Sequence, residues 1–581
     1  MTQTNGIPPT SEDRPPCPSC TQNECQCPIE ASRGRILREL LMVSKKDQLN
    51  THRRFIPRQA LCGVVTAQEV GRHLKLVLGD QPDLIESLTA EIAPDEESET
   101  HCCLNRKCTG KRILFASFLQ IAKEDYMLGL CQTNVEYCDS RLNESAPSQL
   151  SDGQTLTNRE LQMIAWVQSQ IRYHLLVRLD PEVGTAFDFD DGACLPLSDP
   201  SPITPTAVEG DSQPQMNAKI LTMHKITRIT VEPGHHEFDS GSNDFVLKTF
   251  KNPSDDDETK SVNSDFDHEL KINRQLEQHP RIVPLLTAFQ FRDEYHLLFP
   301  FAPRRDLQSL WGAYPIGKPD WCTPRWVLTE CIGIAEALEH IHTRRPPLLH
   351  ADIKPPNILC FPPQGDDEGP KLKLSDFGIS LTAETNPEFK VEGRPHTKTY
   401  RPPEFETEKT ITLNYDVWSL GCVFLEFLTW AIEGLKATED FETRREDEDD
   451  DPRACKAEGK TQEDKFFRKA VAKSPLFGAK GKRSLRIQFV WYQTKSILPD
   501  KNIQSLRAPF HVSRKFTVRC HVKEAVDNHI SRLEGLPHCP PEYRAFLGII
   551  KGRMLDVDHK SRATSSEVRD ELQKIDIMDI N

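Results

Sequence analysis

Hydrophobic residues in the N-terminal third of the chain recur at helical spacing. In residues 35–43, 113–130 and 161–179 an apolar side chain returns every three or four positions, as on the buried face of a helix. We therefore expect a mostly α-helical N-terminal domain over residues 31–187. It is preceded by a Cys/Pro-rich tail over residues 1–30, which we expect to be disordered.

The pattern changes after a segment without periodicity. Residues 188–218 are rich in Pro, Asp and Ser and predict a linker. Beyond them, residues 245–250 are apolar on both sides of a single lysine, Lys248, and residues 295–302 form a second apolar run. The first of these runs predicts a buried strand. A lysine in such a strand needs a partner of opposite charge, because an unpaired buried ammonium is costly.

Two short strands and a buried helix are predicted in the C-terminal half. Residues 358–361 and 371–374 predict two strands joined by a loop. The most apolar run, residues 423–432, is interrupted by Glu426 and is shorter than the roughly 18 residues of a membrane span. It predicts a buried helix, and no membrane span is expected.

Composition and charge narrow the possible functions. At 581 residues the chain is too long for one domain, and 37% hydrophobic residues suffice for a core. The net charge of −14 argues against a nucleic-acid-binding protein. Because the N-terminus lacks the basic and apolar regions of a signal peptide, we expect an intracellular protein, cytoplasmic or nuclear, whose 18 cysteines are mainly reduced.

Much of the acidic charge lies in two runs, residues 255–258 and 446–451, and such runs are usually solvated loops. The second run opens an insert near residues 436–515, which also holds a basic stretch over residues 480–486. That stretch could contact the acidic run, serve as a weak nuclear address, or form a plain surface loop, which is the interpretation we favour.

Two groups of cysteines have spacings that a metal could use. Cys17, Cys20, Cys25 and Cys27 form the first, and residues 101–108 add one histidine and three cysteines. They fit a zinc site, or reduced thiols in a flexible segment, and the residues alone leave both interpretations open.

The candidate chemistry lies in two motifs, His350-Ala-Asp-Ile-Lys-Pro-Pro-Asn357 and Asp376-Phe-Gly378, on either side of the two short predicted strands. Phosphoryl transfer needs one carboxylate near the acceptor hydroxyl and another on the metal. Asp352 and Asp376 can fill these roles. Asn357 offers an amide oxygen as a second metal ligand, and Lys354 can neutralise charge that builds on the transferred phosphate.

These motifs resemble the catalytic and metal-binding loops of eukaryotic protein kinases, and other kinase elements follow in the right order. Residues 400–404, Tyr-Arg-Pro-Pro-Glu, resemble the end of an activation segment, and residues 416–421 resemble the start of the central helix. Arg562 sits where kinases place the arginine that pairs with that glutamate. The resemblance implies an α+β, two-lobed protein kinase fold over residues 219–575, with an antiparallel β small lobe and a mainly α large lobe.

The resemblance also implies a nucleotide site. Lys248 is similar to the strand lysine that holds the α- and β-phosphates of ATP, and Glu269 to its partner on the neighbouring helix. Residues 295–302 resemble the strand that leads into the adenine-binding segment. The backbone carbonyl of Pro300 and the N–H of Ala302 would then face adenine, with Phe299 at the back of the pocket.

The implied cofactors are ATP and Mg²⁺, and the implied partner is a protein substrate. Asp352 would orient the substrate hydroxyl, Lys354 would steady the phosphate, and Asn357 and Asp376 would bind the metal. Thr397 resembles the threonine that hydrogen-bonds the catalytic aspartate in serine/threonine kinases, and Lys354 points to the same class.

Three positions depart from the family pattern. Residues 219–231, where we expect the first strands and their glycine-rich loop, contain no glycine, and Gly234 is alone before an apparent strand end at residues 235–238. Ala351 replaces the arginine that usually precedes the catalytic aspartate, so we expect activity not to require activation-loop phosphorylation. Asn273 is polar where kinases usually carry an apolar residue.

Two functions therefore stay open. We prefer an active serine/threonine protein kinase, because every charged catalytic group is present. The alternative is a pseudokinase that acts as a binding or scaffold module, which the missing glycines favour. A contact between the N-terminal domain and the kinase domain could be regulatory, and the overall layout is similar to divergent kinase-like proteins of filamentous fungi.

Overall fold

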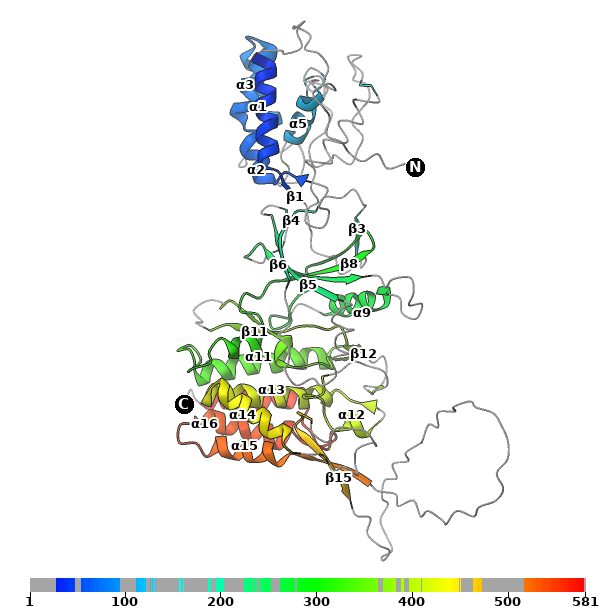
Figure 1. The fold of residues 1–581 in the computed structure, drawn as a ribbon, viewed down its shortest axis with the longest axis vertical. Coiled ribbons are helices and arrows are strands. Elements are labelled where there is room, and N and C mark those ends of the chain that lie inside the picture. Colours follow the sequence, from blue (N-terminus) through cyan, green and yellow to red (C-terminus); the bar gives the residue numbers. More distant parts are fainter. Residues whose placement is uncertain are drawn as a thin grey trace, which may run out of the picture. The chain divides into compact units, whose positions relative to one another are not determined.

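The computed structural model describes residues 28–46, 54–94, 111–121, 186–202, 224–276, 279–448, 463–472 and 517–578, with short gaps within these ranges, and isolated positions elsewhere. The chain forms two compact units, Met1–Pro303 and Arg304–Asn581. Figure 1 shows helices followed by a sheet in the first unit, and mainly helices in the second.

Helices form the beginning of the first unit, as predicted. They are α1 (Pro28–Val43), α2 (Arg58–Val64), α3 (Ala67–Leu78), α4 (Pro82–Ile92) and α5 (Arg112–Ile121), and a short hairpin of β1 (Lys45–Lys46) and β2 (Arg54–Phe55) follows α1. The helix predicted over residues 35–43 is confirmed, and the one over residues 113–130 is confirmed to Ile121. The helix predicted over residues 161–179 and both cysteine groups lie outside the described residues.

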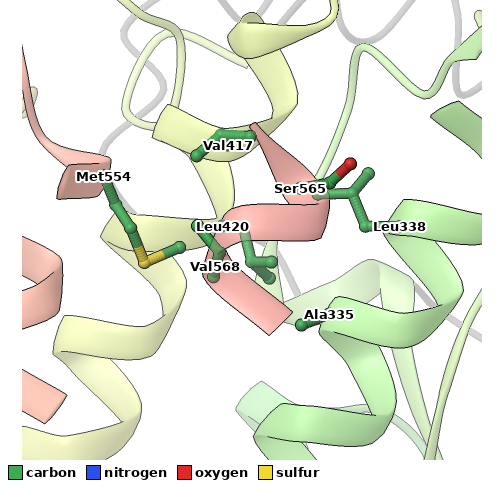
Figure 2. A pocket seen from close by; sticks show the side chains of 7 residues that line it. All are labelled: Ala335, Leu338, Val417, Leu420, Met554, Ser565 and Val568. Carbon is green, nitrogen blue, oxygen red and sulfur yellow. The ribbon is translucent and has the colours of Figure 1, made fainter. Parts of the chain in front are cut away.

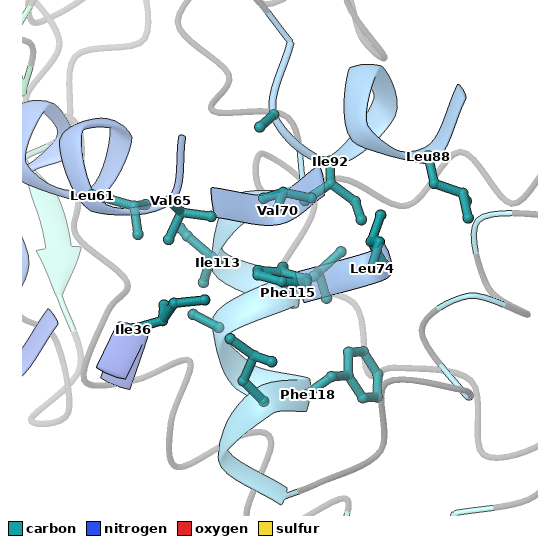
Figure 3. Packing of buried hydrophobic residues seen from close by; sticks show 14 of the residues in the cluster. Ile36, Leu61, Val65, Val70, Leu74, Leu88, Ile92, Ile113, Phe115 and Phe118 are labelled. Carbon is teal, nitrogen blue, oxygen red and sulfur yellow. The ribbon is translucent and has the colours of Figure 1, made fainter. Parts of the chain in front are cut away.

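A single apolar cluster holds these helices together (Figure 3). Ile36 of α1, Leu74 of α3 and Phe115 of α5 point into it and are almost fully buried. The helix α3 begins where the Thr66 hydroxyl accepts a hydrogen bond from the Glu69 backbone N–H, which satisfies a donor at the helix start. Burial of one face of each helix, more than helix propensity, therefore stabilises this domain.

A six-stranded sheet completes the first unit. Its order is β3-β7-β8-β6-β5-β4, and α9 (Val262–Gln275) packs beside it. The strands are β3 (Phe187–Phe189), β4 (Leu197–Pro202), β5 (His224–Val231), β6 (Asp244–Lys251), β7 (Thr287–Phe291) and β8 (Glu294–Pro300). All neighbouring pairs are antiparallel except β3 with β7. The strands predicted around Lys248 and over residues 295–302 are confirmed as β6 and β8.

The linker predicted over residues 188–218 is wrong for its first half, because β4 lies within it. Pro200 and Pro202 of β4 suggested a linker, yet β4 is the edge strand, and its register with β5 shifts between Ser198 and Ser201. Proline is tolerated at an edge or a bulge, where no partner needs its missing N–H. The connection from the edge strand β4 to its neighbour β5 is therefore residues 203–223, which lie outside the described residues. The first strands were predicted over residues 219–231, so the sheet begins earlier than predicted.

The second unit is mainly helical. Its larger helices are α11 (Pro324–Thr343), α13 (Asn414–Glu433), α14 (Leu435–Glu446), α15 (Glu524–Glu534), α16 (Pro541–Ile549) and α17 (Ser565–Met578), with short α10 (Leu307–Gly312) and α12 (Glu404–Thr407) and single turns η3 (Pro355–Asn357) and η4 (Ile550–Met554). Its paired strands are β10 (Ile358–Phe361) with β11 (Lys371–Leu374), β9 (Leu348–Leu349) with β12 (Leu381–Thr382), β13 (Phe389–Lys390) with β14 (Thr410–Ile411), and β15 (Phe467–Ala472) with β16 (Thr517–Val522).

The helix α13 is the centre of this unit, as its apolar sequence predicts. A β-carbon at Gly421 would stand 2.9 Å from the Met554 β-carbon, so glycine allows η4 to pack against the helix. Figure 2 shows Leu338, Val417 and Val568 converging from three helices at a gap too small for a water molecule. Among the described residues only α13 has the length and apolar composition of a membrane span, and 94% of its apolar window is buried.

The acidic run over residues 446–451 is not wholly a solvated loop, which corrects the prediction. Asp450 is 2% exposed and accepts a hydrogen bond from the Lys465 ammonium at 2.7 Å. Residues 436–515 are likewise not all insertion, because α14 and β15 belong to the packed unit. The basic stretch 480–486 and the acidic run 255–258 lie outside the described residues.

Candidate active site

Asp416 fixes the first of the two predicted loops from the start of α13. Its carboxylate is fully buried and accepts hydrogen bonds from the backbone N–H groups of His350, at 2.7 Å, and Ala351, at 2.9 Å. The His342 ring lies 3.0 Å from the same carboxylate. Ala351 has a φ of 68°, a left-handed conformation that costs a non-glycine residue energy. The charge-assisted bonds to Asp416 offset that cost.

His350 joins this loop to the second one. Its Nδ1 accepts from the Asp352 backbone N–H and its Nε2 donates to the Ser375 carbonyl. The ring also packs against Phe377, with centroids 4.8 Å apart. Ser375 donates through its backbone N–H and its hydroxyl to the Asn357 carbonyl, each at 2.9 Å. The two loops are therefore held as one piece.

Asp352 lies at the centre of a group of polar side chains. Its carboxylate accepts from the Thr397 hydroxyl at 2.8 Å, from the Asn357 amide at 3.0 Å, and pairs with the Lys354 ammonium at 2.7 Å. Lys354 also donates to the Thr397 hydroxyl at 3.1 Å. Burial and the nearby Asp352 carboxylate raise the pKa of Tyr415 behind this group. Of these contacts, the resemblance predicted the hydrogen bond between Thr397 and Asp352, and together they hold one carboxylate in a defined orientation.

Asn357 and Asp376 carry the oxygens that suit a hard cation. The Asn357 amide nitrogen donates to the Asp352 carbonyl at 2.8 Å and to its carboxylate, so the remaining polar atom of the side chain is an amide oxygen. Asp376 is exposed and has a φ of 64°. Mg²⁺ is usually held by one or two such ligands together with substrate phosphates, so this donor set fits magnesium. The described residues contain no group of three or more His, Cys, Asp or Glu that could hold a metal.

The first unit contains the predicted lysine–glutamate pair. The Lys248 ammonium of β6 lies 2.8 and 2.7 Å from the two carboxylate oxygens of Glu269 on α9. The Glu269 side chain is 3% exposed, so the lysine has the partner that burial demands. Asn273, one turn on, donates its amide to the Glu269 carbonyl at 2.9 Å, which accounts for a polar residue at this buried position.

The residues predicted to face adenine lie at the end of β8 and just beyond it. Pro300 is the last residue of the strand and is paired with Phe245 of β6. Ala302 is 5% exposed, and Phe299 is partly buried against the cluster beneath α9. The structure thus brings Lys248 and Glu269 together in the first unit, and Asp352, Lys354 and Asn357 in the second.

The end of the predicted activation segment is anchored by an ion pair in the core. Glu404 is 1% exposed, and its carboxylate receives two hydrogen bonds from the Arg562 guanidinium, at 2.6 and 3.0 Å. The same guanidinium donates to the Asn414 and Asp556 carbonyls and lies over the Trp418 ring. The pairing predicted between Glu404 and Arg562 is present.

Comparison with known proteins decides the family. The family model of the protein kinase domain matches residues 239–571, more than half of the chain. The chain belongs to the protein kinase family. The two-lobed α+β fold predicted for this kinase is therefore confirmed, with the sheet and α9 as the small lobe and the second unit as the large lobe.

Individual relatives support the same family. A probable serine/threonine-protein kinase of Arabidopsis thaliana, PBL5, is 31% identical over 179 residues, which are 30% of this chain and 39% of that protein. The serine/threonine-protein kinase PBS1 of the same plant is 33% identical over 158 residues, 26% of this chain and 33% of that protein. An Aurora kinase of Yarrowia lipolytica is 29% identical over 171 residues, 29% of this chain and 42% of that protein. The kinase thus spans less than half the length of these relatives.

Sequence reasoning missed several side chains that organise the site. Asp416 was placed at the start of the central helix, but its bonds to the catalytic loop were not predicted. The signal was present, because a carboxylate that opens so apolar a helix needs hydrogen-bond donors. Asp450 and Lys465 gave no comparable signal, because their pairing is visible only once the chain is folded.

Proposed function

We propose that this protein is a serine/threonine protein kinase that transfers the γ-phosphoryl group of ATP to protein hydroxyls. The observation that carries the proposal is the orientation of Asp352 by Thr397, Asn357 and Lys354. A carboxylate held by three neighbours presents its charge without further rearrangement, which is how phosphoryl transfer is accelerated. The lysine–glutamate pair of the small lobe supports the same function.

Each side chain has a role in the proposed reaction. The substrate hydroxyl oxygen forms a bond to the γ-phosphorus, the bond to the bridging oxygen of ADP breaks, and the hydroxyl proton passes toward Asp352. Lys354 offsets negative charge on the transferred phosphoryl group. Lys248, oriented by Glu269, would hold the α- and β-phosphates, and the backbone at Pro300 and Ala302 would hold adenine. Asn357 and Asp376 would hold Mg²⁺, which neutralises phosphate charge when bound.

Thermal unfolding of the purified chain with and without Mg²⁺-ATP tests the nucleotide site. A ligand that binds only the folded state at about 100 times its Kd stabilises it by about 2.7 kcal/mol, so we expect a rise in Tm of roughly 5 °C. The Asp376→Ala variant should lose the magnesium-dependent part of this rise, because it lacks a carboxylate that would hold the metal.

The matched control is Asp320→Ala, which removes an exposed carboxylate elsewhere in the large lobe. It should keep the full rise in Tm. A parent chain whose Tm is unchanged at millimolar Mg²⁺-ATP would contradict the proposed kinase and favour the second function described next.

The second candidate is a pseudokinase that binds partners through the same fold. It is favoured by the connection between β4 and β5, residues 203–223, which holds one glycine, Gly210. Close approach of the backbone to phosphates usually needs several glycines, because other residues resist the required conformations.

We also infer a regulatory contact between the N-terminal helical domain and the small lobe. The Lys45 ammonium of β1 lies 2.5 Å from the Glu232 carboxylate, and the Phe55 ring of β2 packs edge-on to His235. Glu232 follows β5, is 6% exposed, and accepts from the Ser198 hydroxyl of β4 at 3.0 Å. The contact therefore braces the edge strand β4 and its neighbour β5, whose connection is residues 203–223.

Reversal of the charge at Lys45 tests this contact. In Lys45→Glu a second carboxylate faces the buried Glu232, and we expect the affinity for Mg²⁺-ATP to fall about 2- to 5-fold, since a half-exposed pair contributes up to about 1 kcal/mol. Lys75→Glu on the exposed face of α3 is the control. Equal affinities for the parent and Lys45→Glu, measured by titration calorimetry, would refute a regulatory role for the contact.

A further inference from the structure

The end of the activation segment is bound by the residues that precede and begin β15. We call residues 463–469 the anchor segment. Lys398 pairs with Glu463 at 3.1 Å, and Glu406 of α12 pairs with Lys469 at 2.7 Å and with Arg401. The anchor segment therefore contacts the activation segment on both sides of the Pro402-Pro403 pair.

The pairs meet at a lysine that is fully enclosed. Lys465 is 0% exposed, and its ammonium lies 2.7 Å from Asp450, 3.3 Å from Glu463 and 3.6 Å from Glu406. Burial alone would raise the pKa of Glu406, but the attraction of Arg401, Lys465 and Lys469 lowers it to about 2. Because a buried charged side chain is costly without its partner, this arrangement resists separation.

A second group of buried side chains holds Tyr400, which lies between Lys398 and Glu406 in the chain. The Tyr400 hydroxyl donates to the Glu426 carboxylate of α13 at 2.9 Å, and Glu426 receives the Arg445 guanidinium of α14 at 2.9 Å. Arg445 also pairs with Asp464 of the anchor segment at 2.8 Å. The Tyr400 and Phe466 rings pack with centroids 6.4 Å apart. Tyr400 is thus joined to the anchor segment through two carboxylates and one guanidinium.

The beginning of residues 397–406 is held by the catalytic loop. Thr397 is bonded to Asp352 and Lys354, and Ala351 beside the catalytic aspartate supplies no cation. The hydrogen bonds and ion pairs described above therefore orient residues 397–406 through side chains of the chain itself.

We propose that the anchor segment holds residues 397–406 in the conformation that binds the substrate peptide, so that this kinase needs no phosphate in its activation segment. Glu463 and Lys465 are the positioning residues, acting through Lys398 and Glu406. The peptide-binding role rests on the proposed kinase function, whereas the ordering of residues 397–406 does not.

Hydrogen–deuterium exchange of the purified full chain tests the ordering directly. In Glu463→Gln the Lys398 and Lys465 ammonium groups lose a charged partner, and we expect exchange of the amides in residues 398–406 to rise about tenfold, as loss of a charged hydrogen bond predicts. Glu339→Gln is the matched control, because the Glu339 side chain is equally exposed but pairs with Arg569 of α17, outside the anchor segment. The parent treated with a protein phosphatase should exchange like the untreated parent.

A second variant separates positioning from a general loss of packing. Lys398→Gln should raise exchange in the same amides, and the double variant Lys398→Gln/Glu463→Gln should exceed the larger single effect by little, because both act through one pair. With a pool of serine/threonine peptides as substrate, Glu463→Gln should raise KM for peptide about 5- to 10-fold and leave KM for ATP unchanged.

Three results would overturn the proposal: no rise in exchange for Glu463→Gln, an equal rise for Glu339→Gln, or a rise in the phosphatase-treated parent. A chain that shows the expected exchange but no Mg²⁺-ATP stabilisation would leave the anchor in place and refute the kinase function instead.

Discussion

Replacing Asp352 by asparagine is expected to lower the rate of phosphoryl transfer about 10²- to 10⁴-fold. An amide keeps the shape of the side chain but cannot take the proton of the attacking hydroxyl, and a positioned base contributes an effect of this size. It also loses the charge that pairs with Lys354 at 2.7 Å. The measurement is the initial rate of ³²P transfer from ATP to a pool of serine/threonine peptides.

The Tm rise caused by Mg²⁺-ATP should persist in Asp352→Asn, because the proposed metal ligands Asn357 and Asp376 are unchanged. The matched control, Asp320→Asn, makes the same change at an exposed site and should keep the parental rate. An Asp352→Asn variant that transfers phosphate as fast as the parent would exclude Asp352 as the base and place the observed activity in a contaminating kinase.

The sequence predicted those parts of the fold in which the interacting residues lie close together in the chain, within one strand, helix or loop. The strands over residues 358–361 and 371–374 have the predicted bounds, because alternation and the flanking turn residues fix them. The cost of burying a lone lysine predicted that Lys248 has a partner, and the resemblance to protein kinases identified that partner as Glu269. Asp352, Lys354 and Asn357 were placed through the motif, since all three lie within one short loop.

The remaining features depend on contacts between distant segments. The strand β4 carries two prolines and no alternation, and only its pairing with β5 makes it a strand. Asp450 and Lys465 lie in a strongly charged stretch of the kind that is usually exposed to solvent. They are buried here because Lys465 pairs with both Asp450 and Glu406. Neither effect leaves a periodic signal, because register and ion pairing are properties of the folded chain.

The largest effect on stability is expected at Arg562. In Arg562→Met the Glu404 carboxylate remains in the core, 1% exposed, without its cation, and breaking a buried pair in this way costs about 3–5 kcal/mol. The Asn414 and Asp556 carbonyls lose their donors as well. We expect the Tm of the large lobe to fall by about 10 °C, measured by scanning calorimetry or from the urea midpoint.

Two further variants show whether the loss of stability in Arg562→Met comes from the burial of the Glu404 carboxylate or from the loss of an ion pair as such. Arg532→Met breaks a bidentate pair with Glu433 whose side chains are 41% and 21% exposed, and it should cost at most about 1 kcal/mol. The double variant Glu404→Gln/Arg562→Met removes the stranded carboxylate and should recover part of the loss. If Arg562→Met is no less stable than Arg532→Met, the Glu404–Arg562 pair does not stabilise the kinase, and the end of the activation segment is held by Tyr400 and the anchor segment alone.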